Sequence, residues 1–249
     1  MQYILSPLYM GVKYAVNENF FKEWTPEMAY VLGYIYADGS LEDASYIRGK
    51  YIRISSVDQD SIVRIKKCLN SEHKISELEP YGMGRKIRYL LRIGSHRIYN
   101  DLIAYGLSPN KSLTVEFPVI PKKYLCHFVR GYFDGDGCVM FERSKGKKQR
   151  LITKRLRIVF TSGSRKFLEG LLTILENNLG LSHGKVYNSH RSLQIRYSTS
   201  DSIKLFKSFY GDDLGEMYFK RKYAIFRNYF QANSRRVDVK IHSILKNTK

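Results

Sequence analysis

The feature that most constrains this chain is a nine-residue segment that occurs twice. Val31–Gly39 reads VLGYIYADG, Val129–Gly137 reads VRGYFDGDG, and both end in Asp-Gly. After each copy comes the same succession of patterns: a strand, an apolar helix, further strand, and a second helix. Internal similarity of this kind is typical of a structural unit that is used more than once. The chain of 249 residues is therefore expected to fold as two similar halves.

Alternating apolar and polar residues in each half predict sheets that bury one face. Ile52 and Ile54 would point into the first half, and Leu156, Ile158 and Phe160 into the second. Later strands are expected at 86–93 and 193–198, and helices around 62–69, 98–105, 167–175 and 203–210. The predicted fold class is α+β, with two pseudo-symmetric αββαββα subdomains built on antiparallel sheets.

The two halves are expected to join at a short link between Phe117 and Pro121, where two prolines interrupt regular structure. This divides the chain into an N-terminal subdomain, residues 1–117, and a C-terminal subdomain, residues 118–249. The second subdomain ends in a polar, basic tail from Ala232 onward, for which the pattern predicts no definite structure.

Each repeated segment is expected to be a helix. Thr25 is a good N-cap and Pro26 suits the first helical position, while the second helix is expected to begin near Pro121. Gly39 and Gly137 would end the helices in a left-handed conformation. Each helix carries two small residues four apart on one face: Gly33 with Ala37, and Gly131 with Gly135.

Small residues on one face let two helices approach closely, which would bring Asp38 and Asp136 side by side at one end. Two neighbouring carboxylates repel unless cations lie between them. Hard divalent ions such as Mg²⁺ prefer oxygen ligands and can activate water for attack on a phosphodiester. A single Asp-Gly is more simply a polar helix end beside a turn glycine. Two copies at matching places favour a shared site.

The charge balance favours nucleic acid as the partner. Lys and Arg number 42 against 23 Asp and Glu, which gives a formal net charge of +19. Such a surplus repels itself in the compact state, and binding to phosphates relieves that repulsion. A basic protein with no polyanionic partner is the plainer alternative. The sequence has neither a secretion signal nor an apolar stretch long enough to span a membrane, so an intracellular, unsecreted protein without membrane association is expected.

Both nine-residue segments resemble the LAGLIDADG motif of one homing endonuclease family. The resemblance to the single-chain, double-motif members of that family covers most of the chain, from about Trp24 to Phe226. In that family the last Asp of each motif binds the metals, and the motif helices form the interface between the two halves. Carried over to this chain, the metal-binding role falls on the following positions: Asp38 and Asp136, assisted by the backbone carbonyls of Ala37 and Gly135.

One position departs from the motif of the family. The family has an earlier Asp in each motif, but the first copy here has Tyr36, whereas the second copy has Asp134. That earlier position is not the metal ligand in the family. The resemblance therefore implies a supporting, structural role for Asp134.

The family also carries a lysine near the active site in each half. The segment Gly106–Ser112 resembles the stretch before the second motif and places Lys111 at that position. In the second half Lys222 is the best match, and Lys220 and Arg221 compete with it. Such a lysine would polarise the attacking water or stabilise charge on the phosphate; a solvated surface lysine is the plainer alternative. The expected cofactor is Mg²⁺, with Mn²⁺ able to substitute and Ca²⁺ binding without turnover.

Members of the family lay a saddle-shaped sheet from each half over the DNA duplex. Arginine can read guanine and glutamine can read adenine in the major groove, although an exposed strand face is polar in any protein. The run 143–150 is the densest in positive charge and would either grip the backbone from a hairpin tip or form a solvated turn. The outward strand positions expected to contact DNA are Arg53, Lys86, Arg88, Arg92, Arg155, Arg157, Gln194 and Arg196.

The resemblance implies a site-specific endonuclease that makes a metal-dependent double-strand break in long double-stranded DNA and leaves short 3′ overhangs. Two non-identical halves in one chain imply an asymmetric target and a monomer. The alternatives are an intron RNA maturase, a non-catalytic DNA-binding regulator of the same fold, and an architectural DNA binder without chemistry. Retention of both motif aspartates and both candidate lysines favours the enzyme.

Overall fold

The protein forms two similar units, each a four-stranded antiparallel sheet covered by helices on one face. The computed structural model describes residues 14–44, 46, 49–80, 86–145, 151–211 and 217–247. The N-terminal unit contains α1 (Pro26–Asp38), β1 (Gly39–Ala44), β2 (Gly49–Ser56), α2 (Gln59–Cys68), β3 (Ile75–Leu78), β4 (Arg88–Gly94) and α3 (His96–Ala104). The C-terminal unit repeats this order with α4 (Leu125–Asp136), β5 (Gly137–Lys145), β6 (Leu151–Ser162), α5 (Arg165–Leu179), β7 (Val186–Ser189), β8 (Ser192–Tyr197) and α6 (Thr199–Tyr210).

The prediction of two α+β units with the order αββαββα is therefore confirmed. The strand orders β1-β2-β4-β3 and β5-β6-β8-β7 are equivalent, and all paired strands are antiparallel. The C-terminal unit adds two helices, α7 (Lys220–Ala232) and α8 (Val239–Asn247). The tail for which the sequence predicted no structure thus contains α8, which buries Ile241 and Ile244.

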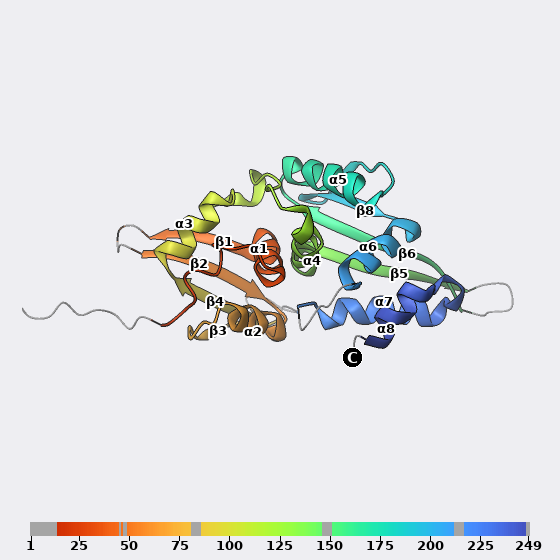
Figure 1. Ribbon diagram of the computed structural model, residues 1–249, viewed down its shortest axis with the longest axis horizontal. Helices are drawn as coiled ribbons and strands as arrows, with labels where there is room; N and C mark the ends of the chain where they lie inside the picture. The colour runs from red at the N-terminus through yellow and green to blue at the C-terminus, as the bar shows by residue number, and fades with distance from the viewer. Residues whose placement is uncertain are drawn as a thin grey trace, which may run out of the picture.

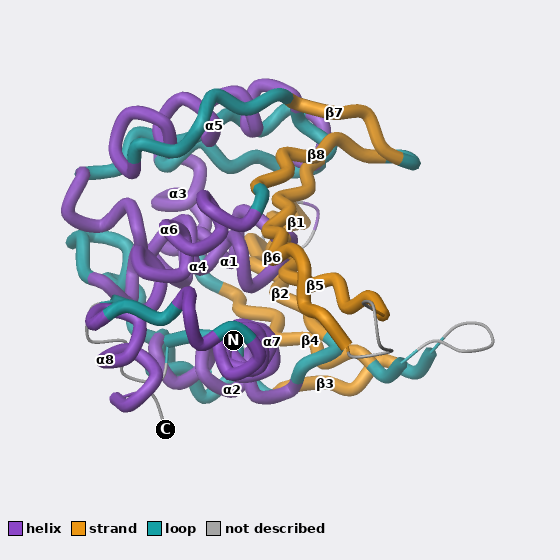
Figure 2. Tube along the Cα trace, turned by 90° about the vertical axis from the view of Figure 1, so that its right-hand side faces the viewer, coloured by secondary structure: helices purple, strands orange, loops and turns teal. Residues whose placement is uncertain are grey.

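Strand register follows from the alternation seen in the sequence. Ile52 and Ile54 in β2, like Leu156, Ile158 and Phe160 in β6, are buried under the helices, as predicted. Because side chains alternate along a strand, the residues between them lie on the opposite face. That face of both sheets carries no helix: Figure 2 shows the strands on one side of the molecule and the helices on the other.

The helices α1 and α4 lie side by side at the centre, between the two sheets (Figure 1). They are buried along nearly their whole length, from Met28 to Tyr36 in α1 and from His127 to Asp134 in α4. Each runs directly into the first strand of its own sheet, so the motif residues at their ends emerge where the two sheets meet. This arrangement confirms that the motif helices form the interface between the units.

Candidate active site and nucleic-acid interface

Glycines in the two motif helices allow direct contact between their backbones. A Cβ atom built on Gly33 would lie 2.0 Å from the backbone oxygen of Phe128, and one on Gly131 would lie 2.0 Å from that of Tyr30. One turn after Gly131, a Cβ built on Gly135 would lie 2.4 Å from the Cβ of Ala37. No side chain fits at these distances, so the sequence of small residues sets the separation of α1 and α4.

The starts of the motif helices largely follow the sequence. Thr25 caps α1 by accepting a hydrogen bond from the Met28 amide at 3.0 Å, and Pro26 follows it, as predicted. The second helix begins one turn later than expected from Pro121, because a short 3₁₀ segment, Lys122–Tyr124, precedes α4.

The predicted left-handed helix ends are wrong. Gly39 has φ −93° and ψ 157°, and Gly137 has φ −89° and ψ 159°, so both are extended and open the following strand. Glycine is needed there for space. A Cβ would lie 2.6 Å from the Ile35 oxygen at the first position and 2.5 Å from the Phe133 oxygen at the second.

Asp38 and Asp136 emerge together from the ends of α1 and α4. Asp38 is half-buried, whereas Asp136 is exposed. Burial and then the neighbouring Asp136 carboxylate raise the pKa of Asp38 to about 6, against the pull of Lys222, Arg88 and Lys111. Desolvation also raises the pKa of Asp136, and Lys111 and Lys222 oppose it. The fold therefore concentrates negative charge at one point and stabilises it incompletely, as the adjacent motif ends predict.

The raised pKa of Asp38 predicts that this residue destabilises the protein at neutral pH. An Asp in the unfolded chain has a pKa of about 4, and the folded-state pKa is about 6. The protonated form of Asp38 is the one that the fold favours. Its contribution to stability is therefore fully present below about pH 4 and is lost as pH rises through about 6. We compare the free energy of unfolding of Asp38→Asn with that of the wild type in EDTA. The difference, variant minus wild type, is expected to rise by about 2 kcal/mol from pH 4 to pH 7.5. Urea denaturation at both pH values measures this gain; an equal difference at the two pH values would contradict it.

Lys111 and Lys222 occupy equivalent places beneath the motif ends. The Lys111 Nζ donates to the carbonyl oxygens of Tyr36 at 2.6 Å and Ala37 at 3.5 Å. The Lys222 Nζ donates to those of Asp134 at 2.8 Å and Gly137 at 2.6 Å, and also to that of Phe133. The last carbonyls of a helix carry partial negative charge and lack partners within the helix, so an ammonium group suits them.

Both lysines are buried, with 6% of Lys111 and 5% of Lys222 exposed. Burial lowers the pKa of Lys222 to about 8 and also lowers that of Lys111, while nearby Asp carboxylates act in the opposite direction. Among the aspartates, Asp136 has the largest opposing effect on Lys111. The two aspartates and two lysines predicted from the sequence thus lie together at one place. The plainer alternative, that the lysines are solvated at the surface, is wrong.

Asp134, where the motif copies differ, is a fully buried carboxylate. Its Oδ2 accepts hydrogen bonds from the Tyr30 hydroxyl and from the Phe219 amide, both at 2.9 Å. Burial raises its pKa to about 6, with the Lys222 ammonium opposing. Asp134 therefore joins α4 to α1 and to the start of α7, which carries Lys222. At the equivalent place Tyr36 instead donates to the Tyr105 carbonyl.

The sheet faces without helices carry the cations expected to meet DNA. In the N-terminal sheet Arg53 pairs in register with Arg92, and Glu42 receives two hydrogen bonds from Arg92 at 2.8 and 3.2 Å. The Arg92 guanidinium also lies over the Tyr51 ring, 3.4 Å from its centroid. Arg88 is exposed on β4, whereas Lys86, which was expected within that strand, precedes it.

In the C-terminal sheet Arg155, Arg157 and Arg196 also lie on the face without helices. Arg157 pairs with Glu142 at 3.0 Å, and the Arg196 guanidinium donates to the Gln194 side-chain oxygen at 3.0 and 3.1 Å. Of the basic run 143–150, residues 146–150 lie outside the described residues, and β5 and β6 flank them.

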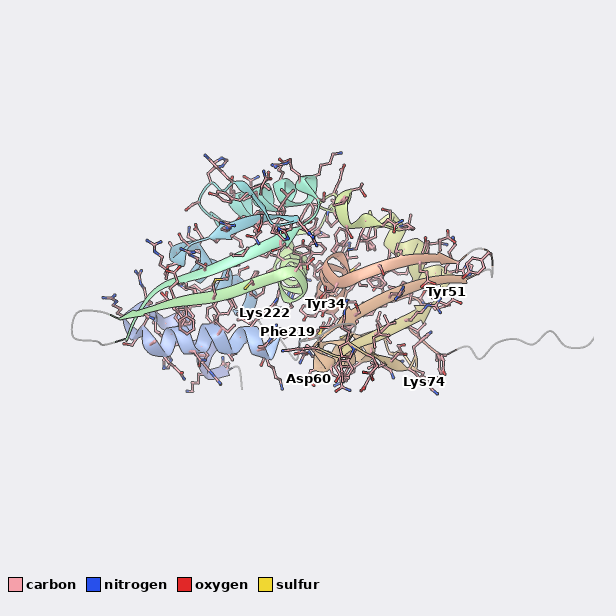
Figure 3. All side chains as sticks on the ribbon, turned by 180° about the vertical axis from the view of Figure 1, so that it is seen from behind. Tyr34, Tyr51, Asp60, Lys74, Phe219 and Lys222 are labelled. Carbon is pink, nitrogen blue, oxygen red and sulfur yellow. The ribbon has the colours of Figure 1, made fainter. Side chains whose placement is uncertain are left out.

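Two residues at the centre, Phe219 and Tyr30, carried no signal of their own in the sequence. Phe219 lies beside Lys222 at the start of α7, at the junction of the two units (Figure 3). Arg221 lines the cavity beside Asp38. Tyr30 lies within the apolar stretch of α1 and resembles an ordinary core residue. In the run Lys220-Arg221-Lys222, the best match by resemblance was Lys222, and Lys222 is the buried cation of the three.

Both the sequence and the fold of this chain are similar to those of known proteins. A family described as "LAGLIDADG-like domain" matches residues 123–211. The structure of the homing endonuclease I-WcaI bound to its DNA recognition sequence is similar, with a TM-score of 0.56 and 14% identity over 84% of this chain and 91% of that one. The match to a LAGLIDADG-like domain thus covers residues 123–211, and the fold of the whole chain is that of the LAGLIDADG structures.

Two further structures with the LAGLIDADG fold are similar over most of this chain. I-LtrWI bound to target DNA has a TM-score of 0.56 and 12% identity, and the match covers 94% of this chain and 99% of that one. I-DmoI in complex with DNA and Mn has a TM-score of 0.51 and 21% identity over 76% and 98%. Comparison with curated proteins gave no match. Within the described residues, no helix is long and apolar enough to cross a membrane.

Proposed function

We propose that this protein is a site-specific DNA endonuclease that makes a double-strand break in a long, asymmetric target and leaves short 3′ overhangs. The observation that carries the proposal is the pair Asp38 and Asp136, emerging together between two sheets whose open faces carry arginines. Similar structures are described as homing endonucleases bound to DNA, which supports the same substrate class.

The donors at this point fit a divalent metal ion. Asp38 and Asp136 supply carboxylate oxygens, and the carbonyls of Ala37 and Gly135 are the assisting oxygen donors in the proposal. Hard ions such as Mg²⁺ take such ligands, and a bound ion would relieve the repulsion that helps raise the pKa of Asp38. Similar structures are described with Mn and with Ca. We propose Mg²⁺ as the cofactor, with Mn²⁺ as a substitute and Ca²⁺ binding without turnover. When bound, the metal would activate water and stabilise the leaving oxygen.

The remaining roles fall on residues of this chain. Lys111 and Lys222 would stabilise charge on the phosphate, since both are buried beside the aspartates and held in place by backbone carbonyls. The arginines of the sheets, with Lys86 and Gln194, would contact backbone and bases of the DNA. We further propose that the chain acts as a monomer with subdomains 1–117 and 118–249, each serving one half of the target.

The test is to incubate the purified protein with a randomised duplex library in Mg²⁺ and to sequence newly made ends. The proposal expects discrete paired cuts with short 3′ overhangs, which would also identify the target. Binding of DNA without any cut ends, in Mg²⁺ or in Mn²⁺, would overturn it. That result would favour a non-catalytic DNA-binding regulator, and retention of intron RNA on a filter would then separate a maturase from a regulator.

A further inference from the structure

A cavity of about 560 Å³ opens beside Asp38, where the two units meet. One wall comes from the N-terminal unit and includes Ser55, Lys86 and Arg88, and the other comes from the start of α7 and includes Arg221. Two arginines from different units thus face one space that has a motif aspartate in its wall. A cavity of this size has room for a phosphodiester and its adjoining sugars.

Among the residues that the structure describes, none forms an ion pair with either arginine of this cavity. Arg88 donates to the Ser55 hydroxyl oxygen at 2.7 Å, and the Arg221 guanidinium lies 5.2 Å from the centroid of the Phe219 ring. Glu79 also lines the cavity, but within the described part of the chain no ion pair joins it to either arginine. Guanidinium groups match the geometry of phosphate oxygens and bind them bidentately.

The pseudo-symmetric place beside Asp136 lacks these cations. Gly39 pairs with Ile54, which pairs with Leu91 on the next strand. Likewise Gly137 pairs with Phe160, which pairs with Ile195. Leu91 and Ile195 therefore occupy equivalent positions in the two sheets. Three residues before them stand Arg88 in the first sheet and Ser192 in the second.

The position of Arg221 is unmatched as well. Lys111 and Lys222 are equivalent, since each donates to the carbonyl at the same motif position, Tyr36 or Asp134. The residues before the two lysines are Asn110 and Arg221. Two cations at one half of the site therefore correspond to two neutral residues at the other.

The electrostatics of the two aspartates agree with this difference. Arg88 is among the cations that lower the pKa of Asp38, whereas at Asp136 the cations with that effect are Lys111 and Lys222. The two halves of the site thus share the aspartate and lysine set and differ in the additional cations.

We propose that Arg88 and Arg221 together bind one backbone phosphate of the DNA in the cavity beside Asp38, that this phosphate site serves one strand, and that the two strands are consequently cut at unequal rates. The inference rests on the proposed function for its second part, the unequal cutting. Its first part, the phosphate site, concerns binding alone and is tested separately.

The binding test uses a fluorescein-labelled duplex of 30 base pairs and random sequence, without divalent metal, at several salt concentrations. The logarithm of the binding constant falls linearly with the logarithm of the salt concentration, and each neutralised phosphate adds about 0.9 to the magnitude of that slope. Because both arginines serve one phosphate, the double variant Arg221→Ala with Arg88→Ala is expected to reduce the magnitude of the slope by about one in total, and each single variant by no more than that. Arg221→Lys should keep the slope. Lys246→Ala, at the exposed end of α8, is the control. An unchanged slope in the double variant, or a loss of about two, would overturn the shared phosphate site.

The cleavage test uses a supercoiled plasmid carrying the target found in the library, with the two strands labelled separately. Arg221→Ala and Arg88→Ala are expected to slow cutting of the same strand by about 10-fold or more, so that nicked circles accumulate. Asn110→Gly is the matched control; Asn110 has φ +59°, which glycine adopts freely. Equal slowing of both strands would overturn the strand assignment. If the wild-type protein cuts nothing, the proposed function fails, while the salt slope still decides the phosphate site.

Discussion

A protein with Asn in place of Asp136 is expected to bind its DNA target and leave it uncut. Asparagine keeps the shape of the side chain but removes the negative charge and one anionic oxygen ligand. The site then loses half of the carboxylate pair that would hold a divalent ion between α1 and α4. We expect the rate of cleavage in Mg²⁺ to fall by about 1000-fold or more, which corresponds to about 4 kcal/mol in activation free energy.

Binding and cutting need to be measured separately for this variant. In Ca²⁺, electrophoretic mobility shift should give a Kd within about threefold of the wild type, because the sheet arginines are untouched and the contacts to phosphate dominate affinity. Asp60→Asn is the matched control, since Asp60 is exposed in the first turn of α2 and belongs to neither motif. Cleavage by Asp136→Asn within tenfold of the wild type would remove Asp136 from the catalytic set.

The central packing could be predicted because the repeat and the helix period act together. Gly33 and Gly131 lie at the same motif position, and each meets a backbone oxygen of the other helix. A residue without a side chain at that place in both copies has a structural reason in a helix, where glycine is otherwise unfavourable. The position of Asp38 and Asp136 at one end then follows from the common length of the motifs.

The helix ends could not be predicted from the same glycines. Gly39 and Gly137 read as left-handed stops because glycine after a helix commonly adopts that conformation. Both are extended instead, and glycine is required because a Cβ would collide with the helix that precedes it. The residue type is the same in the two cases, so the choice depends on the direction of the following strand.

The supporting contacts lie beyond any local pattern. The Asp134 carboxylate meets Tyr30, which is 104 residues away, and the Phe219 amide, which is 85 residues away. Periodicity describes neighbours along one element, whereas these partners are set by how three helices meet. The same holds for Arg221, whose place in the cavity beside Asp38 depends on how the start of α7 faces residues of the N-terminal unit.

Replacing Gly131 by alanine is expected to destabilise the fold strongly, although the same change in an exposed helix would stabilise it. Alanine favours a helix over glycine by about 1 kcal/mol. At Gly131, however, the new methyl group would lie 2.0 Å from the Tyr30 oxygen, and 2.9 and 3.0 Å from the next backbone atoms. Because backbone atoms on both sides cannot rotate away, α1 and α4 must separate and lose packing along the interface.

The sign of the change in stability decides between the two effects. We expect the free energy of unfolding to fall by about 3 kcal/mol or more, and Tm by about 6–12 °C for a chain of this size. Gly33→Ala should behave alike, since its methyl group would meet the Phe128 oxygen at the same 2.0 Å. Ala232→Gly, at the exposed end of α7, reports the propensity effect alone, at about 1 kcal/mol or less. A Gly131→Ala protein as stable as the wild type in thermal and urea unfolding would show that the motif helices can part without cost. The close approach of α1 and α4 would then not be what fixes the spacing of Asp38 and Asp136.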